Sequence, residues 1–307
     1  MHGRTNSIAI YETDVQNDFS YRDGALFVHG FEKSGTQEPY GAESRLPNVL
    51  ALHRWASKQG HIILGSVDRH FFADAELIRN EGGAFDDHCM NGTRGQLRID
   101  GLEQELDVYV RSKDGPGLGQ RSYSEDEMNE MVSVAINDGA QIIFEKQTYY
   151  VGGNPNVRRI LQRFIEEGLK VIAIDGFATD YCCLAAGLEI VDAVRSLGLV
   201  PGEDVHLFIV TDAIAPVNID LEGNMDMAFG SKALETLHGA GVLPITTERI
   251  LSGELERIAE SVEGQRREPE WSAETARGQR REPEWSGESV EGQRRGPEWI
   301  ANTVGGE

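Results

Sequence analysis

The chain has 307 residues, of which 39% are hydrophobic, and its formal net charge at pH 7 is −22. This negative charge argues against nucleic acids and anionic membrane surfaces as partners, because both would repel the protein. The hydrophobic content is enough for a core over most of the chain and indicates one or two domains.

Cysteine usage and hydropathy bear on where the protein works. Three cysteines, two of them adjacent, cannot form a disulfide framework. The first residues contain no apolar stretch of signal-peptide length, and no segment approaches the roughly 20 apolar residues that span a bilayer. These features predict a cytoplasmic protein.

Short apolar runs alternate with amphipathic segments through the first 250 residues. Each run has the length of a buried strand, and the segments between them have helical periodicity. This alternation predicts a doubly wound α/β sheet with six mainly parallel strands. In chain order we expect strands over 7–13, 61–66, 140–145, 171–174, 205–216 and 241–247, and helices over 47–58, 124–138, 155–167, 184–194 and 225–239.

Local signals refine this pattern. Ser124 is followed three residues later by Glu127, the spacing of a capping box at a helix start. Pro244 cannot donate to a ladder, which favours an edge position for the last strand. Residues 68–95 lack periodicity and are expected to form a long loop at the carboxyl edge of the sheet, and residues 107–112 are open as an extra strand.

Polar residues follow four of the predicted strands at the point where each strand ends. They are Asp14, Asp68, Lys146 and Cys182. In an open parallel sheet, ligands bind in the crevice beyond the carboxyl ends of the strands. We therefore expect these four side chains to meet at one site.

Cys182 is the candidate nucleophile. It lies where an amphipathic helix begins, and the unpaired N–H groups and dipole of a helix start lower a thiol pKa. The alternative interpretation makes Cys182 and Cys183 small core residues.

Asp14 and Lys146 would complete an acid–base set around that thiol. A carboxylate can take the thiol proton and pass it to a leaving amine, while an ammonium group stabilises the thiolate. The alternative is that Asp14 only ends a strand in a turn and that Lys146 is a solvated strand end.

A second group of side chains has the chemistry of a metal site. Asp68, His70 and His88 supply oxygen and nitrogen ligands and would leave a position open for water or substrate. Glu76, in the same loop, is either a further ligand or a surface charge.

The C-terminal region differs in composition from the rest. GQRREPEW at 264–271 recurs at 278–285, and GQRRGPEW follows at 292–299, so the period is 14 residues. This predicts a low-complexity, disordered tail over 253–307. The tail either has no role in the chemistry or binds a partner that the sequence does not identify.

The chain resembles the nicotinamidase/pyrazinamidase branch of the isochorismatase-like cysteine hydrolases over roughly residues 6–250. The motifs that carry the resemblance are DVQNDF (14–19), DRH (68–70), DDHCMNGTRG (86–95), Lys146 at a strand end, and DGFATDYCC (175–183). The resemblance implies a three-layer α/β/α hydrolase domain over residues 1–252.

The same resemblance implies roles for individual residues. Cys182, rather than Cys183, would be the nucleophile, with Asp14 as general base and acid and Lys146 as the third member. A non-proline cis peptide would join Phe177 to Ala178 and aim the N–H groups of Ala178 and Cys182 at the oxyanion.

The resemblance also implies how a substrate ring is held. The metal ligands would be Asp68, His70 and His88, with Glu76 as an additional one, and the metal would be zinc, with iron or manganese as alternatives. In that family the metal binds the pyridine nitrogen of nicotinamide, and Phe19 and Phe85 match aromatic positions that pack on the ring.

The sequence departs from the family pattern in three places. Arg69 and Phe71 lie around the D-x-H motif, where the family usually has Trp and Pro, and Phe85 replaces a frequent Trp. Residues 96–139 are longer than the corresponding stretch. That longer segment contains Lys113, a rival for the catalytic lysine. Lys146 is preferred because it ends a strand and lies 36 residues before Cys182, near the family's separation.

These observations predict a nicotinamidase that hydrolyses nicotinamide to nicotinate and ammonia through a cysteine thioester, feeding NAD salvage. The nearest alternative is a relative that acts on another amide, an N-carbamoyl or ureido compound, or an enol ether. A non-catalytic binding protein is the alternative from a different class. The expected partner is a small amide, and homo-oligomerisation stays open.

Overall fold

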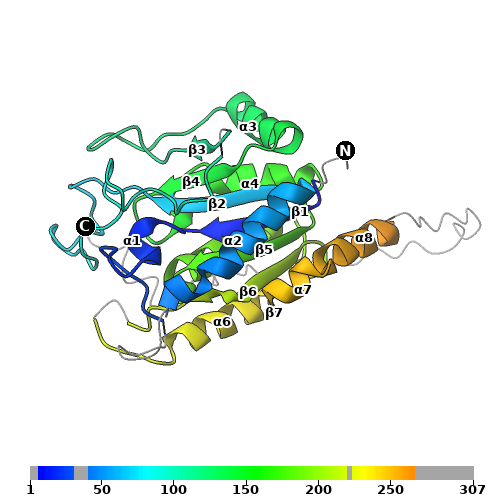
Figure 1. Cartoon of the computed structure of the whole chain (residues 1–307). Coiled ribbons are helices and arrows are strands. Elements are labelled where there is room, and N and C mark those ends of the chain that lie inside the picture. Colours follow the sequence, from blue (N-terminus) through cyan, green and yellow to red (C-terminus); the bar gives the residue numbers. More distant parts are fainter. Residues whose placement is uncertain (1–5, 31–40, 105, 220–222, 267–307) are drawn as a thin grey trace, which may run out of the picture. The chain divides into compact units, whose positions relative to one another are not determined.

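The computed structural model describes residues 6–30, 41–104, 106–219 and 223–266. Its centre is one sheet of seven strands in the order β3-β4-β2-β1-β5-β6-β7, and every neighbouring pair is parallel (Figure 1). The strands are β1 (Ile8–Thr13), β2 (Ile62–Asp68), β3 (Val108–Val110), β4 (Ile142–Lys146), β5 (Val171–Phe177), β6 (His206–Ala215) and β7 (Val242–Ile245).

This sheet confirms the predicted doubly wound α/β class and adds one strand to the predicted six. The added strand is β3, in the segment that the sequence left open. The chain starts at the centre with β1, fills one side of it, and then places β5, β6 and β7 on the other side. β7, which contains Pro244, is an edge strand as expected. The switch point between the two halves lies beside β1, where α/β sheets bind ligands.

The central strands consist of residues that are buried on both faces. All residues of β1, β2 and β5 are buried, which is typical of parallel strands covered by helices on both sides. Alternate residues of β1 therefore contribute to two cores. Ala9 and Tyr11 belong to one hydrophobic cluster, whereas Ile8 and Ile10 belong to the other.

Helices form the outer two layers. The cluster around Tyr11 is covered by α3 (Glu125–Asp138), α4 (Val157–Glu166), α5 (Leu184–Ser196) and α6 (Phe229–Ala240). The cluster around Ile10 is covered by α2 (Gly41–Gln59), α7 (Thr247–Leu251) and α8 (Glu254–Arg266) (Figure 1). The short α1 (Asn17–Ser20), a 3-10 turn at Val151–Gly153 and a π turn at Thr179–Cys183 complete the elements. None of the helices in the described residues is long and apolar enough to cross a membrane.

Helix boundaries agree with the sequence signals at some places and differ at others. The capping box at Ser124 and Glu127 is present at the start of α3. Helix α2 starts at Gly41, six residues before the predicted start, so Pro47 lies inside the helix and not at its first position.

The predicted tail begins at residue 253, but helix α8 follows immediately. Leu255 and Ala259 of α8 are 0% and 4% exposed and belong to the hydrophobic core. Their spacing of four residues places both on one helix face, so the packed part of the chain continues beyond residue 252. The second and third copies of the 14-residue repeat, and most of the first, lie outside the described residues.

Candidate active site and metal centre

The four polar residues predicted at strand ends lie together at the carboxyl edge of the sheet. Asp14 follows β1, Asp68 ends β2 and Lys146 ends β4, and Asp68 is paired with Lys146 in the register of the two strands. Cys182 lies in the π turn between β5 and α5. The sheet topology therefore gathers residues from four neighbouring strands, as the sequence predicts.

Two backbone features bring β1 and the cysteine turn together. Asp14 has a φ of 48°, a left-handed conformation that Asp tolerates better than most residues, and its N–H donates to the carbonyl of Ser66. Gly176 has a φ of 98°, and a Cβ there would lie 2.0 Å from the carbonyl oxygen of Thr13. Only glycine therefore allows β5 to approach β1 this closely.

The two adjacent cysteines of the π turn lie in different surroundings. Cys182 is 7% exposed and lines a cavity, whereas Cys183 is fully buried in the hydrophobic core. The peptide between Phe177 and Ala178, just before this turn, is cis, as the family resemblance implies. Only Cys182 of the adjacent pair therefore lies where a substrate can reach it.

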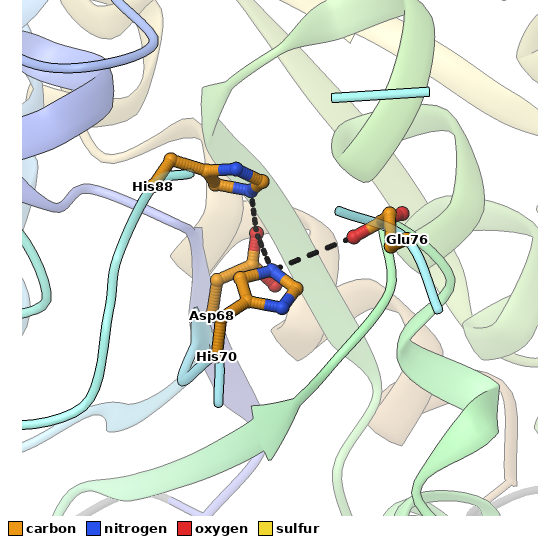
Figure 2. Close-up of side chains that lie close together, drawn as sticks. All are labelled: Asp68, His70, Glu76 and His88. Carbon is orange, nitrogen blue, oxygen red and sulfur yellow. Dashed lines mark ion pairs between the residues drawn. The ribbon is translucent and has the colours of Figure 1, made fainter. Parts of the chain in front are cut away.

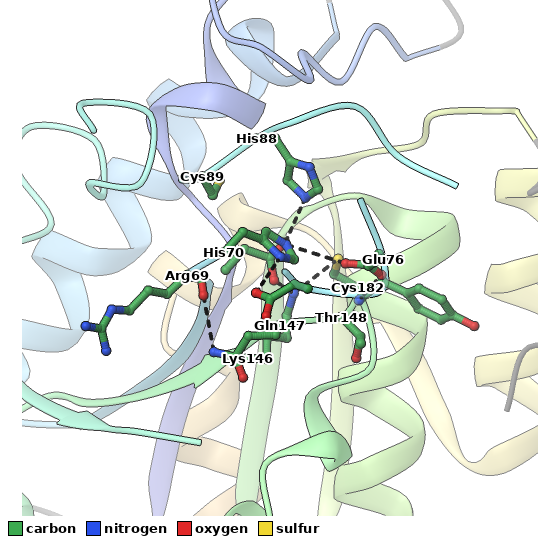
Figure 3. A network of polar contacts seen from close by, with 12 residues as sticks. Arg69, His70, Glu76, His88, Cys89, Lys146, Gln147, Thr148 and Cys182 are labelled. Atoms are coloured by element: carbon green, nitrogen blue, oxygen red, sulfur yellow. Dashed lines mark hydrogen bonds and ion pairs between the residues drawn. The ribbon is translucent and has the colours of Figure 1, made fainter. Parts of the chain in front are cut away.

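Lys146 is the centre of the polar cluster. Its Nζ lies 2.7 Å from Asp14 Oδ2 and 2.5 Å from Asp68 Oδ1. The same nitrogen lies 3.7 Å from Cys182 Sγ (Figure 3). Asp14 also accepts a hydrogen bond of 2.8 Å from the hydroxyl of Ser66. One buried ammonium group thus joins the sulfur, the carboxylate proposed as a base and a carboxylate of the metal group.

The charges in this cluster set its protonation states. Burial works against the charge on Lys146, but the carboxylates of Asp14 and Asp68 outweigh it and hold the pKa of Lys146 well above its usual range. Burial also raises the pKa of Asp14; Lys146 opposes this shift and Asp68 adds to it. A carboxyl group with a raised pKa is suited to both taking and giving a proton near neutral pH.

The thiol of Cys182 differs from the sequence-based expectation. Burial, together with the carboxylates of Asp14 and Asp68, raises the pKa of this thiol well above its usual range, although Lys146 opposes the shift. The expectation of a lowered pKa considered only the helix start and omitted the loss of solvent. A buried thiol of this kind needs a base beside it before it can attack.

The four predicted metal ligands form a compact group, with one ligand atom from each lying within 4.8 Å of the others (Figure 2). This metal group consists of Asp68, His70, Glu76 and His88. Asp68 Oδ2 lies 3.5 Å from His88 Nε2, and Glu76 Oε2 lies 3.5 Å from His70 Nε2. His70 is fully buried, and its Nε2 has no hydrogen-bond partner among the described residues.

This donor set fits a divalent metal. Two imidazoles and two carboxylates are ligands for zinc, iron or manganese, and a cation would satisfy the unpaired nitrogen of His70. Burial, with the charge of Asp68, raises the pKa of Glu76 to about 7, because two carboxylates lie close together here away from solvent.

Contacts behind the ligands orient them. His88 Nδ1 lies 2.7 Å from the carbonyl oxygen of Asp86, so Nδ1 carries the proton and Nε2 faces the group with its lone pair. The N–H of Tyr149 donates to Glu76 Oε1 over 2.7 Å. Glu76 is therefore held with its other oxygen toward His70.

A cavity of about 370 Å³, including the open space at its mouth, joins the metal group to Cys182. The predicted substrate contacts Phe19, Phe85 and Ala178 all line it. The remaining lining residues are Leu26, Val28, Asp68, Glu76, His88, Tyr149, Tyr181, Cys182 and Val217.

Sequence reasoning missed two aromatic residues of this cavity, Tyr149 and Tyr181. Their ring centroids lie 5.8 Å apart, and that of Phe85 lies 6.5 Å and 5.6 Å from them. Tyr181 directly precedes Cys182, and Tyr149 follows Lys146 by three residues. Both positions adjoin residues that the sequence had already marked, and this proximity was the available signal.

Lys113, the rival for the catalytic lysine, lies elsewhere. Its ammonium contacts the carboxylate of Asp74 and lies 5.2 Å from the ring centre of Phe71. Lys146 is therefore the lysine beside Cys182. Arg69, another departure from the family pattern, pairs with Glu145 at 3.0 Å.

No protein-family model and no curated protein matches the sequence. Solved structures do match. The pyrazinamidase of Pyrococcus horikoshii in complex with zinc is 20% identical, with a TM-score of 0.50 over 78% of this chain and 99% of that one. PnC1 from L. infantum in complex with nicotinate is 18% identical, with a TM-score of 0.51 over 80% and 96%. An isochorismatase-like hydrolase from Alkaliphilus metalliredigens is 14% identical, with a TM-score of 0.50 over 80% and 98%. The chain therefore has the α/β fold that these three proteins share.

Proposed function

We propose that this protein is a cysteine-dependent amidohydrolase whose substrate is nicotinamide. The observation that carries the proposal is the contact of Lys146 with both Asp14 and Cys182, beside a cavity that also holds a metal-ligand group. Two proteins of the same fold support the choice of substrate, since one is described as a pyrazinamidase in complex with zinc and another is in complex with nicotinate.

The cavity lining favours a neutral aromatic amide. Among the described residues that line it, none is Lys or Arg, whereas Asp68 and Glu76 are acidic. Lys146 is already engaged by two carboxylates. The described lining therefore offers no Lys or Arg side chain to pair with a substrate's own carboxylate, such as that of an N-carbamoyl amino acid, whereas a planar ring can pack against Phe85 and its aromatic neighbours.

The first half of the reaction forms a thioester. Asp14 takes the proton of the Cys182 thiol, and the ammonium of Lys146 stabilises the thiolate. The sulfur then attacks the carboxamide carbon, with backbone N–H groups of Ala178 and Cys182 as donors to the oxyanion. The C–N bond breaks, and ammonia leaves with the proton that Asp14 returns.

The second half regenerates the enzyme. Asp14, again ionised, takes a proton from water, which attacks the thioester carbon. The C–S bond breaks, the sulfur regains its proton from Asp14, and nicotinic acid leaves and gives its own proton to solvent to become nicotinate. One carboxyl group therefore acts as base and acid in turn, which agrees with its raised pKa and with its position next to Lys146.

Asp68, His70, Glu76 and His88 would hold the divalent metal, with zinc as first choice and iron or manganese as alternatives. When bound, the metal supplies a Lewis acid for the ring nitrogen of the substrate and so orients the carboxamide toward Cys182. We extend the proposal to a cytoplasmic enzyme that returns nicotinamide to NAD salvage.

A panel of substrates tests the proposal. Purified protein with its metal content measured is incubated with nicotinamide, pyrazinamide, an N-carbamoyl amino acid and a ureido compound, and ammonia is measured. We expect release from nicotinamide and pyrazinamide alone, and none from the Cys182→Ala variant. Release from the carboxylate-bearing compounds alone would replace nicotinamide as the substrate. No release from any amide, together with a Cys182 that iodoacetamide does not label, would favour a binding protein.

A further inference from the structure

Two side chains behind the metal ligand His70, those of Asp74 and Lys113, are not used in the chemistry above. His70 Nδ1, on the far side of the ring from Glu76, lies 3.4 Å from Asp74 Oδ2. The other oxygen of Asp74 contacts the ammonium of Lys113. Asp74 is 5% exposed and the side chain of Lys113 is 17% exposed, so both are largely out of solvent.

Asp74 is held in this orientation by its own loop. Its Oδ2 accepts the N–H of Phe71 over 2.8 Å, and its carbonyl oxygen accepts the side-chain amide of Asn80 over 2.8 Å. Asp74 is therefore fixed from two directions while it faces the imidazole of His70. The 3.4 Å between Asp74 Oδ2 and His70 Nδ1 is an ion-pair distance without hydrogen-bond geometry, and a carboxylate beside the ring favours one orientation of a metal-binding histidine.

Lys113 lies in the segment 96–139, which is longer than the family pattern. It follows β3, the added edge strand, and forms a bridge with Gln120, so that the segment folds back on itself. The N–H of Arg121 donates to the carbonyl of Ser112 over 2.7 Å. The segment thus delivers one ammonium to one buried carboxylate, over the ring of Phe71.

We propose that Lys113 is a positioning residue of the metal centre, which acts through Asp74 to hold His70 with its Nε2 toward Asp68 and Glu76. The inference rests on the metal group of the proposed function. The ammonium fixes the carboxylate of Asp74 beside Nδ1, and this carboxylate keeps the ring turned so that Nε2 faces Glu76. Removal of such an outer partner typically lowers metal affinity about 10–100-fold.

The competing explanation is that the contact between Lys113 and Asp74 only joins two loops and stabilises the fold. Loss of such a contact would lower the stability of the metal-free protein and leave its metal affinity unchanged. Loss of a positioning residue would lower the affinity. The charge is the active feature in our proposal, so Lys113→Arg should restore the affinity that Lys113→Met loses.

Metal affinity of the full-length chain, stripped with a chelator, separates these outcomes. The dissociation constants of Zn²⁺ and Mn²⁺ are measured by competition with a chromophoric chelator, and the thermal midpoint is recorded without metal. Lys232→Met is the matched control, because Lys232 forms a surface pair of 2.6 Å with Asp226 and its side chain is 62% exposed.

We expect Lys113→Met and Asp74→Asn to weaken metal binding about 10–100-fold, and Lys113→Arg and Lys232→Met to bind as the wild type does. Wild-type affinity in Lys113→Met, whether or not its thermal midpoint falls, would overturn the proposal. So would a wild-type protein that binds neither metal. These measurements need no substrate. A protein whose metal affinity depends on Lys113 but which releases no ammonia would therefore contradict only the proposed function.

Discussion

Replacing Asp14 with Asn tests the role of the carboxylate that contacts Lys146. The substitution keeps the size of the side chain, and its oxygen can still accept the hydrogen bond that Ser66 Oγ donates over 2.8 Å. The buried trio of Asp14, Lys146 and Asp68 changes from a net charge of −1 to 0, because two carboxylates and one ammonium become one of each. We therefore expect the variant to fold and to lose activity through its chemistry.

The size of the loss follows from the two proton transfers assigned to Asp14. General acid–base catalysis contributes about 10²–10⁴-fold, and Asp14 serves both halves of the reaction. A loss near the upper end, about 10⁴-fold in kcat/KM, corresponds to about 5.5 kcal/mol of transition-state stabilisation. The variant also loses one of the carboxylates that raise the pKa of the Cys182 thiol, so alkylation of Cys182 by iodoacetamide at pH 7 should be at least as fast as in the wild type.

Ammonia release from nicotinamide and the rate of Cys182 alkylation are the two readouts, with a thermal melt to verify folding. The label should go to Cys182, because Cys89 and Cys183 are both fully buried. Peptide mapping with fragmentation identifies the labelled cysteine. Asp175→Asn is the matched control: Asp175 is also a fully buried carboxyl group near the end of a central strand, but it does not line the cavity. A folded Asp14→Asn enzyme within tenfold of wild-type kcat/KM would refute the assignment of Asp14.

The remaining predictions concern the cysteines, a buried charge and the metal. Cys182→Ser should abolish ammonia release, whereas Cys183→Ser should keep it, as measured with the same assay on folded variants; the reverse pattern would exchange their roles. Burial raises the pKa of Asp175 well above its usual value of 3.8, and the carboxylate of Glu12 adds to the shift. The contribution of Asp175 to stability is therefore fully present below about pH 3.8, where its carboxyl group is protonated in both the folded and the unfolded state. This contribution is lost as the pH rises and only the unfolded state ionises. Urea unfolding of Asp175→Asn should show a gain of about 1–3 kcal/mol at pH 7 that vanishes near pH 3.5, and a gain independent of pH would contradict this. Chelation should stop nicotinamide turnover and added Zn²⁺, Fe²⁺ or Mn²⁺ should restore it, so full activity in metal-free protein would exclude a metal role.

The α/β class and the shared sheet edge could be predicted because both depend on short-range patterns. Apolar runs ending in Asp14, Asp68 and Lys146 mark strands and their carboxyl ends, and topology then gathers those ends. Lys146 could be preferred over Lys113 because it ends a predicted strand and lies 36 residues before Cys182, near the family's separation.

Other features depend on partners that are distant in sequence. Glu12 interrupts an apolar strand, yet it is buried because His53 lies 2.7 Å away and Arg98 contacts its other oxygen. Neither partner is near Glu12 in the chain. The raised pKa of Cys182 likewise reflects burial and two carboxylates from other strands, none of which a local helix-start argument contains.

The longer segment at 96–139 shows the same limit from another side. The sequence indicated that it was additional and that it contained Lys113, but not where that lysine would lie. Its position over Phe71 and against Asp74 depends on the added strand β3 at the sheet edge. The contact of Lys113 with Asp74, on which its proposed role depends, could therefore not be predicted from the sequence.

Trapping the covalent intermediate tests the central claim that Cys182 attacks a carboxamide. Enzyme mixed with excess nicotinamide is quenched in acid within the first turnovers, digested, and mapped by mass spectrometry. Our account predicts a nicotinoyl group on the peptide that contains Cys182, and its loss in Cys182→Ser. Ammonia release that continues in Cys182→Ser, with no acyl group on that peptide of the wild type, would contradict it.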